Sequence, residues 1–344
     1  MKLRNRIFVC AFLLLSLIGC SRSEYEVIYN AETGEAESRQ PDQANSYTIA
    51  VIPKVSGIPY FNAAEEGALE AGSDLGVNVL YKGPLIADWR HQSEIIESFI
   101  EKDVDAIAVS ANDPDKLGSV LTEAMNQGIK VMTWDSDTSP VYRSLYINMV
   151  DPEVLGRHVM DTLASRLEEK GEFAILTDSK QAANTNEWIH WMKVQHAEYY
   201  PAMELVDIRE TDDSPTKAYD AATELLNERE DLDGIIGASS VGPPAAVQAV
   251  LDADKQDDIE VVGLSTPNLM RAFIQDGQTE IVTLWSPKRL GYLTVSIAKS
   301  VLEGNQPADN QYFPNIGVIR VEGDTVIMGR PIDFTRENID EYDF

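Results

Sequence analysis

An aromatic residue and two carboxylates, Trp134, Asp135 and Asp137, lie within four residues after a short run at residues 130–133. The run is typical of a buried strand, because it is short, has an apolar centre and is partly β-branched. In a parallel α/β sheet, ligands bind beyond the carboxyl ends of the strands, near the point where the strand order reverses. A plain turn is the alternative, although a turn more often carries Gly, Asn or a single Asp. The run therefore indicates either a ligand site or a polar turn.

Polar and aromatic groups also follow the other predicted strands. Hydroxyl-rich ligands such as sugars need carboxylates and amides for their hydroxyls and aromatic faces for their C–H surfaces. The candidate aromatic walls are Tyr60, Phe61, Trp134 and Trp285. The candidate polar contacts are Asp135, Asn184, Asn186 and Ser239. Each of these residues could instead cap a helix or end a turn, but together they favour a sugar site.

Signals for catalysis or metal binding are thin. The chain has no G-x-x-x-x-G-K-[ST], G-x-G-x-x-G, G-x-S-x-G or H-E-x-x-H motif. His190 and His196 would lie on different faces of a helix, so they would not share a metal. Asp135 and Asp137 are two apart on an extended strand end and point to opposite sides, which argues against a shared acid–base pair. We therefore expect a non-enzymatic protein without a metal or cofactor, in which Asp137 supports the loop.

The elements that would position these groups alternate along the chain. From Tyr47 onward, short β-branched runs alternate with amphipathic segments, which predicts βαβ units and parallel sheets. A first cycle of strands is expected at 47–52, 77–81, 106–109, 130–133 and 144–147. A second cycle is expected at 173–177, 205–209, 234–237, 260–264 and 281–284. Two successive cycles predict two similar lobes with a cleft between them.

The N-terminal residues have the pattern of a targeting segment. Basic residues precede an apolar run at 7–18, which is too short for a membrane-spanning helix. The run ends in Leu17-Ile18-Gly19-Cys20, which resembles the bacterial lipobox. We expect residues 1–19 to be a lipoprotein signal peptide, Cys20 to carry the lipid, and residues 20–46 to be a flexible tether. The other cysteine, Cys10, lies inside the signal, so the mature chain would have no disulfide.

The chain is strongly acidic, with a formal net charge of −29 at pH 7. A phosphate backbone requires a basic protein face, so nucleic acid binding is not expected. Residues 47–344 are numerous enough for two domains of ordinary size.

Taken together, the loops resemble the type I periplasmic sugar-binding proteins of ABC importers, the ribose-binding class. The resemblance is strongest to the rhamnose-binding and autoinducer-2-binding branch, and it extends over residues 47–344. The stretches that carry it are 52–54, 104–114, 133–137, 184–188, 262–268, 284–285 and 337–344. It implies two Rossmann-like α/β lobes joined by a hinge, with the ligand held in the cleft between the lobes.

The resemblance also implies domain boundaries and further site residues. The N-terminal lobe would comprise 47–148 and 286–314, and the C-terminal lobe 149–285 and 315–344. Crossovers would lie near Asn148, Ser265–Pro267 and Asn315. Lys54 and Asp135 match ligand contacts of autoinducer-2 receptors. Ser265 lies in the matching stretch 262–268, and Ser240 lies in the loop 238–242, which resembles the rhamnose-binding branch. Both complete the candidate site.

The ligand that the resemblance favours is L-rhamnose or a similar sugar. Autoinducer-2 receptors have an acidic residue and a glutamine where Asn184 and Thr185 stand. Neutral groups at these positions suit an uncharged deoxyhexose. The expected protein is a monomeric, lipid-anchored receptor on the outer face of the cytoplasmic membrane that delivers its sugar to an ABC permease and ATPase. An autoinducer-2 or pentose receptor, or a sensor subunit for a chemoreceptor or histidine kinase, remains the alternative.

Overall fold

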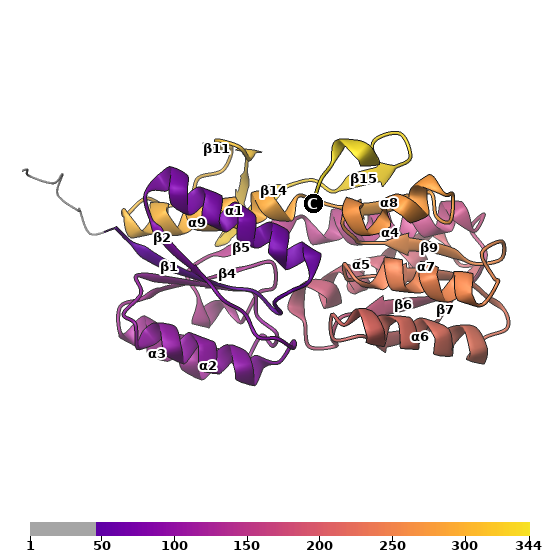
Figure 1. The fold of residues 1–344 in the computed structure, drawn as a ribbon, viewed down its shortest axis with the longest axis horizontal. Helices are drawn as coiled ribbons and strands as arrows, with labels where there is room; N and C mark the ends of the chain where they lie inside the picture. The colour runs from indigo at the N-terminus through magenta and orange to yellow at the C-terminus, as the bar shows by residue number, and fades with distance from the viewer. Residues whose placement is uncertain (1–45) are drawn as a thin grey trace, which may run out of the picture. The chain divides into compact units, whose positions relative to one another are not determined.

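Two main sheets organise residues 46–344, the part of the chain that this computed structural model describes (Figure 1). The first sheet has seven strands and the second has four. The proposed signal peptide, Cys20 and nearly all of the tether lie outside the described residues. No helix within residues 46–344 is both long and apolar enough to cross a membrane.

The first sheet and its helices form what we call the N-lobe. Its strand order is β13-β14-β5-β4-β3-β1-β2, and only the β13–β14 pair is antiparallel. The strands are β1 (Thr48–Ile52), β2 (Asn78–Tyr81), β3 (Ala106–Val109), β4 (Lys130–Trp134), β5 (Tyr146–Val150), β13 (Arg320–Glu322) and β14 (Thr325–Gly329). The central strands are buried on both faces, as continuous apolar runs such as Ala106–Val109 predict. The strand order reverses between β1 and β3, so a ligand site is expected beyond their carboxyl ends.

Helices cover both faces of the first sheet. Figure 1 shows α1 (Pro59–Leu75) and α9 (Pro287–Leu302) on one face, and α2 (Trp89–Ile100) and α3 (Gly118–Asn126) on the other. A stripe of small buried residues on α1, from Ala64 to Gly72, allows close packing on α9. A Cβ at Gly67 would lie 1.8 Å from the Lys288 carbonyl oxygen, and one at Gly291 would lie 2.0 Å from the Ala64 carbonyl oxygen.

The second sheet and its helices form what we call the C-lobe. Its order is β7-β6-β8-β9, all parallel. Its strands are β6 (Gly171–Thr177), β7 (Met203–Glu210), β8 (Leu232–Gly237) and β9 (Glu260–Gly263). Its helices are α4 (Pro152–Arg166), α5 (Ala183–Tyr199), α6 (Pro215–Glu228), α7 (Gly242–Asp252) and α8 (Pro267–Gln275). In this sheet the strand order reverses between β6 and β8. A ligand site is therefore expected at the loops that follow these two strands, as it is at the loops after β1 and β3 in the N-lobe.

The chain crosses between the lobes three times, and two of these crossings lie at positions other than those expected. The first crossing follows β5 at Val150, close to the expected Asn148. The expected crossing at Ser265–Pro267 is wrong, because α8 and β10 (Ile281–Leu284) keep the chain in the C-lobe. The crossing comes instead at Trp285 and Ser286, between β10 and α9.

The third crossing is also displaced from the expected Asn315. β14 pairs in parallel with β5, with Val326 opposite Ile147, so the chain remains in the N-lobe through Gly329. Only then does β15 (Ile332–Thr335) join the C-lobe by pairing with β10. The assignment of all of residues 315–344 to the C-lobe is therefore wrong. The physical reason is that the apolar Val326–Met328 segment is buried as an added strand of the first sheet.

Candidate functional site

The loops after β1, β4, β6, β7 and β8 converge on one cavity between the N-lobe and the C-lobe. Its volume is about 40 Å³, well below the roughly 300–1,000 Å³ of small-molecule pockets. A ligand the size of a sugar therefore enters only if the lobes separate. The lining residues are Lys54, Ile58, Tyr60, Phe61, Asp135, Asp178, Asn184, Thr185, Trp188, Asp213, Ala238, Ser239, Ser240, Leu264, Leu284 and Trp285.

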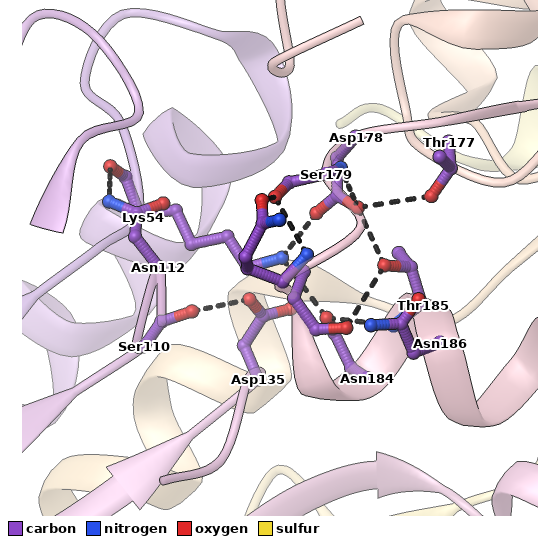
Figure 2. Close-up of polar contacts among 12 residues, drawn as sticks. Lys54, Ser110, Asn112, Asp135, Thr177, Asp178, Ser179, Asn184, Thr185 and Asn186 are labelled. Atoms are coloured by element: carbon purple, nitrogen blue, oxygen red, sulfur yellow. Dashed lines mark hydrogen bonds and ion pairs between the residues drawn. The ribbon is translucent and has the colours of Figure 1, made fainter. Parts of the chain in front are cut away.

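A buried ion pair bridges the two lobes across this cavity. Lys54 Nζ, from the loop after β1, lies 2.5 Å from Asp178 Oδ2, at the end of β6. It also donates to Asn184 Oδ1 at 3.0 Å (Figure 2). Burial alone would lower the pKa of Lys54, but Asp178, Asp135 and Asp213 together raise it above its ordinary value. Lys54 is therefore a fixed cation facing carboxylates from both lobes.

The backbone that carries Lys54 accepts hydrogen bonds from the side-chain amides of the buried Gln92 and the half-buried Asn112. Gln92 Nε2 donates to Pro53 O at 3.0 Å and to Ser110 O at 2.7 Å. Asn112 Nδ2 donates to Lys54 O at 2.9 Å. These contacts connect the loops after β1 and β3 and hold Lys54 in place for binding.

Asp135 is a buried carboxylate aimed into the cavity. Its backbone adopts the left-handed conformation, with φ of 62°, which Asp tolerates better than most side chains. The carboxylate accepts a hydrogen bond from Tyr60 OH at 2.9 Å and from Ser110 Oγ at 2.5 Å. Burial raises the pKa of Asp135, and the Lys54 charge and the two hydroxyl donors oppose this rise.

Aromatic rings form the apolar wall of the cavity. Tyr60 and Phe61 lie in the first turn of α1, and their ring centroids are 5.0 Å apart in an edge-to-face arrangement. Trp285 Nε1 donates to Tyr60 OH at 3.0 Å. Trp188 of α5 packs against Trp285 with ring centroids 5.6 Å apart. Such rings can contact the C–H face of a sugar, while the Tyr60 hydroxyl adds a polar group.

Polar groups of the C-lobe are arranged around Asp178. Thr185 Oγ1 donates to Asp178 Oδ1 at 2.6 Å, and the backbone N–H of Ser179 donates to the same oxygen at 2.7 Å. Thr185 and Asn184 both lie in the first turn of α5. Asp178, Asn184 and Thr185 thus present carboxylate, amide and hydroxyl groups opposite Asp135.

The structure brings most of the predicted site residues together and leaves three outside. The predicted residues that line the cavity are Lys54, Tyr60, Phe61, Asp135, Asn184, Ser239, Ser240 and Trp285. Trp134 is fully buried behind Phe61, with ring centroids 5.9 Å apart, and is not among the residues that line the cavity. The reason is strand alternation, since its side chain points to the face of β4 opposite that of its neighbours in the strand.

The other two exceptions are loop residues. Asn186 is exposed, and its Nδ2 donates to Lys180 O at 2.7 Å, so it shapes the loop before α5 and does not line the cavity. Ser265 is fully buried, and its Oγ donates to Ser240 O at 2.6 Å. It therefore supports Ser240 from behind.

Several lining residues were not singled out from the sequence. Asp178 follows β6 directly, just as Asp135 follows β4, and this equivalence could have identified it. Trp188 lies one helical turn after Asn184, at a spacing that places both on one face of α5. No sequence feature of this kind identifies Asp213. Nothing in the sequence of the loop after β7 indicates that this loop reaches the cavity.

The cavity lining offers both polar and apolar groups to a ligand. Among residues 46–344 no group of three or more His, Cys, Asp or Glu side chains is arranged to hold a metal ion. The lining combines hydrogen-bonding groups from both lobes with aromatic surface, as expected for a ligand enclosed between lobes.

Comparisons with known proteins agree with this geometry. Residues 49–306 match the family described as periplasmic binding protein domain. The D-ribose/D-allose-binding protein of Pseudomonas aeruginosa is 24% identical over 225 residues, covering 64% of this chain and 70% of that protein.

Two solved structures share the fold over 87% and 86% of this chain. An ABC transporter solute-binding protein from Clostridium phytofermentas with bound L-rhamnose is 28% identical, with a TM-score of 0.82 over 98% of that chain. LsrB from Clostridium saccharobutylicum in complex with AI-2 is 23% identical, with a TM-score of 0.82 over 100% of that chain, and shows the fold alone.

These relatives are substrate-binding proteins and not enzymes, in agreement with the sequence-based expectation. The expected periplasmic binding protein type I fold is likewise confirmed. The chain belongs to the periplasmic binding protein family.

Proposed function

We propose that this protein captures a monosaccharide outside the cytoplasmic membrane and delivers it to an ABC importer, with L-rhamnose as the favoured ligand. The observation that carries the proposal is the interlobe cavity, in which Lys54 and Asp135 of the N-lobe face Asp178 and Asn184 of the C-lobe. A sugar bound there would hydrogen-bond to both lobes and so favour their closure.

L-rhamnose is favoured because of the lining and because of the relatives. Asn184 and Thr185 are uncharged, and the walls around Tyr60, Phe61 and Trp285 are aromatic. A deoxyhexose has both hydroxyls and an apolar methyl group, which fit a lining of this mixed character. The solved relative at 28% identity holds L-rhamnose.

The ligand can be identified by the thermal stability of the purified protein in a panel of sugars. A ligand that binds only the folded state raises the free energy of unfolding, by about 2.7 kcal/mol at one hundred times its Kd. We expect L-rhamnose to raise Tm more than autoinducer-2, D-ribose, D-arabinose or D-glucose. A larger rise in Tm with a pentose or with autoinducer-2 would contradict L-rhamnose as the ligand and would support that other compound.

The partner is distinguished by a transport measurement. Deletion of the gene should abolish uptake of the radiolabelled ligand if the protein serves an importer. Unchanged uptake with loss of a transcriptional or chemotactic response would instead support the sensor alternative.

The lipid anchor is tested at Cys20. Labelling with a fatty acid should modify the wild-type chain but not Cys20→Ser, and the variant should not be held at the membrane through a lipid. A labelled Cys20→Ser chain would contradict the lipidation assignment. Gel filtration of the purified protein tests the proposed monomer.

A further inference from the structure

Asp213 is the third carboxylate that lines the cavity, beside Asp135 and Asp178. It belongs to the turn Thr211–Ser214, between β7 and α6, and the residue is 8% exposed. The turn is fixed to the end of β6, because the N–H of Thr211 donates to Thr177 O at 2.8 Å and that of Asp212 donates to Asp178 O at 2.6 Å. The fold thus holds Asp213 in the cavity wall beside Asp178.

The other two carboxylates of the cavity have protein partners. Asp135 accepts from Tyr60 and Ser110. Asp178 accepts from Lys54, Thr185 and the backbone N–H of Ser179.

Asp213 has no comparable set of donors among residues 46–344. The Ser239 hydroxyl lies close to its carboxyl group without reaching normal hydrogen-bond geometry. A buried polar group without a partner costs free energy that a ligand donor can recover. Asp213 is therefore the carboxylate of the cavity with the most capacity left for a ligand.

The charges around Asp213 are mostly of its own sign. Asp178 of the C-lobe and Asp135 of the N-lobe oppose its ionisation, and only Lys54 favours it. The adjacent Asp212 is exposed and pairs with Lys217 of α6. Burial first, and Asp178 next, raise the pKa of Asp213 from 3.8 to about 7.

We propose that Asp213 is a ligand-contacting residue that, in its ionised form, accepts a hydrogen bond from a hydroxyl group of the bound sugar. The inference rests on the proposed function, because it assigns a specificity residue within the same sugar site. A charge-assisted hydrogen bond of this kind is about twice as strong as a neutral one. A sugar that lacks the donating hydroxyl would leave Asp213 unpaired and would be rejected.

The proposal couples sugar binding to proton release. With its pKa raised to about 7 in the closed, ligand-free form, Asp213 is partly protonated near neutral pH, and a ligand hydroxyl that donates to the carboxylate favours loss of that proton. Sugar affinity then falls as the pH is lowered, by roughly tenfold per pH unit well below the pKa.

The test is calorimetric titration of the purified full-length protein with L-rhamnose, or with whichever panel sugar gives the largest Tm shift. Titrations run from pH 5.5 to 8.5, and at pH 6.5 in two buffers of different ionisation enthalpy. The wild-type protein should release a proton on binding and should lose affinity below pH 7. The matched control Asp212→Asn should behave like the wild type, since Asp212 is exposed and its replacement tolerates the same left-handed backbone.

Asp213→Asn should bind at least tenfold more weakly at pH 8, and its affinity should vary little with pH. Wild-type affinity and an unchanged pH profile in Asp213→Asn would overturn the assignment while leaving the proposed function intact. If no sugar of the panel binds the wild-type protein at any pH, the proposed function itself is contradicted, and the role of Asp213 falls with it.

Discussion

Lys54 Nζ and Asp178 Oδ2 lie 2.5 Å apart and connect the loop after β1 with the end of β6. Each residue belongs to a different lobe, so their contact exists only while the lobes are closed on one another. Both side chains are almost fully buried, which makes each depend on the other for compensation of its charge. The lobes are thus held together at the position where the ligand is expected.

Replacing Lys54 by Met should weaken sugar binding strongly, because Asp178 then remains buried without its cation. The double variant Lys54→Met/Asp178→Asn should recover part of the affinity, with a coupling free energy of roughly 0.5–3 kcal/mol for residues in contact. The exposed Lys180, which pairs with Glu210 at 3.5 Å, offers a matched control. Lys180→Met should leave the Kd almost unchanged, since surface ion pairs contribute at most about 1 kcal/mol. Additive effects of the two cavity substitutions would contradict the coupling.

Asp135→Asn should separate binding from folding. The substitution keeps a side chain that tolerates φ of 62° but removes the charge, so sugar affinity should fall by a factor of roughly 10–150, the equivalent of 1.5–3 kcal/mol. The control is Asp137→Asn, because Asp137 accepts from Arg143 Nη2 at 2.7 Å and does not line the cavity. Asp137→Asn should lower Tm and leave the Kd within about twofold. Calorimetry and thermal denaturation measure both quantities, and the reverse pattern would contradict the separate roles.

Trp285 and Trp134 should respond oppositely to replacement by Phe. Trp285→Phe removes the donor to Tyr60 OH and part of the cavity wall, so the Kd should rise by a factor of roughly 5–30, equivalent to ~1–2 kcal/mol. Trp134→Phe removes core volume, and its Nε1 has no hydrogen-bond partner within residues 46–344. It should lower the free energy of unfolding by roughly 1–3 kcal/mol with little change in Kd. A Kd that is more sensitive to Trp134 would restore Trp134 as a wall residue.

Asp213 should make stability depend on pH. Its pKa is raised in the folded protein to about 7 from 3.8, so the folded state binds the proton more tightly than the unfolded state does. The resulting contribution to stability is fully present below pH 3.8 and is lost as the pH rises through about 7. Asp213→Asn should therefore gain stability relative to the wild type between pH 5 and pH 8, by ~2–4 kcal/mol. Urea denaturation of both proteins at pH 5 and pH 8 measures this change. The same difference in the free energy of unfolding between variant and wild type at both pH values would contradict the prediction.

The fold was largely predictable because its signals are local. Buried runs such as Ala106–Val109 and the small-residue stripe of α1 are visible in short windows of sequence. The partner of β14 was not predictable, since Val326–Met328 is apolar enough to extend either sheet. β14 joins the N-lobe because it pairs with the free edge of β5, which is formed only in the folded structure.

The residues of the candidate site likewise include some that could be predicted from local sequence and some that could not. Residues directly after a strand, such as Asp135 and Ser239, could be placed because parallel strands end at a common edge. The sequence did not show that the Trp134 side chain points away from the cavity while that of Asp135 points into it, because these orientations depend on where β4 ends. Asp213 depends on the turn at Thr211–Ser214 being fixed to Thr177, a contact between residues 34 positions apart.

The central claim is that a monosaccharide binds in the cavity between the two lobes. Calorimetric titration of L-rhamnose into the wild-type protein and into Asp135→Asn tests it most directly. Binding to the wild type should be saturable with a stoichiometry of one, and binding to the variant should be at least tenfold weaker. Equal binding to both proteins, or no binding by either with L-rhamnose and every other sugar of the panel, would contradict it.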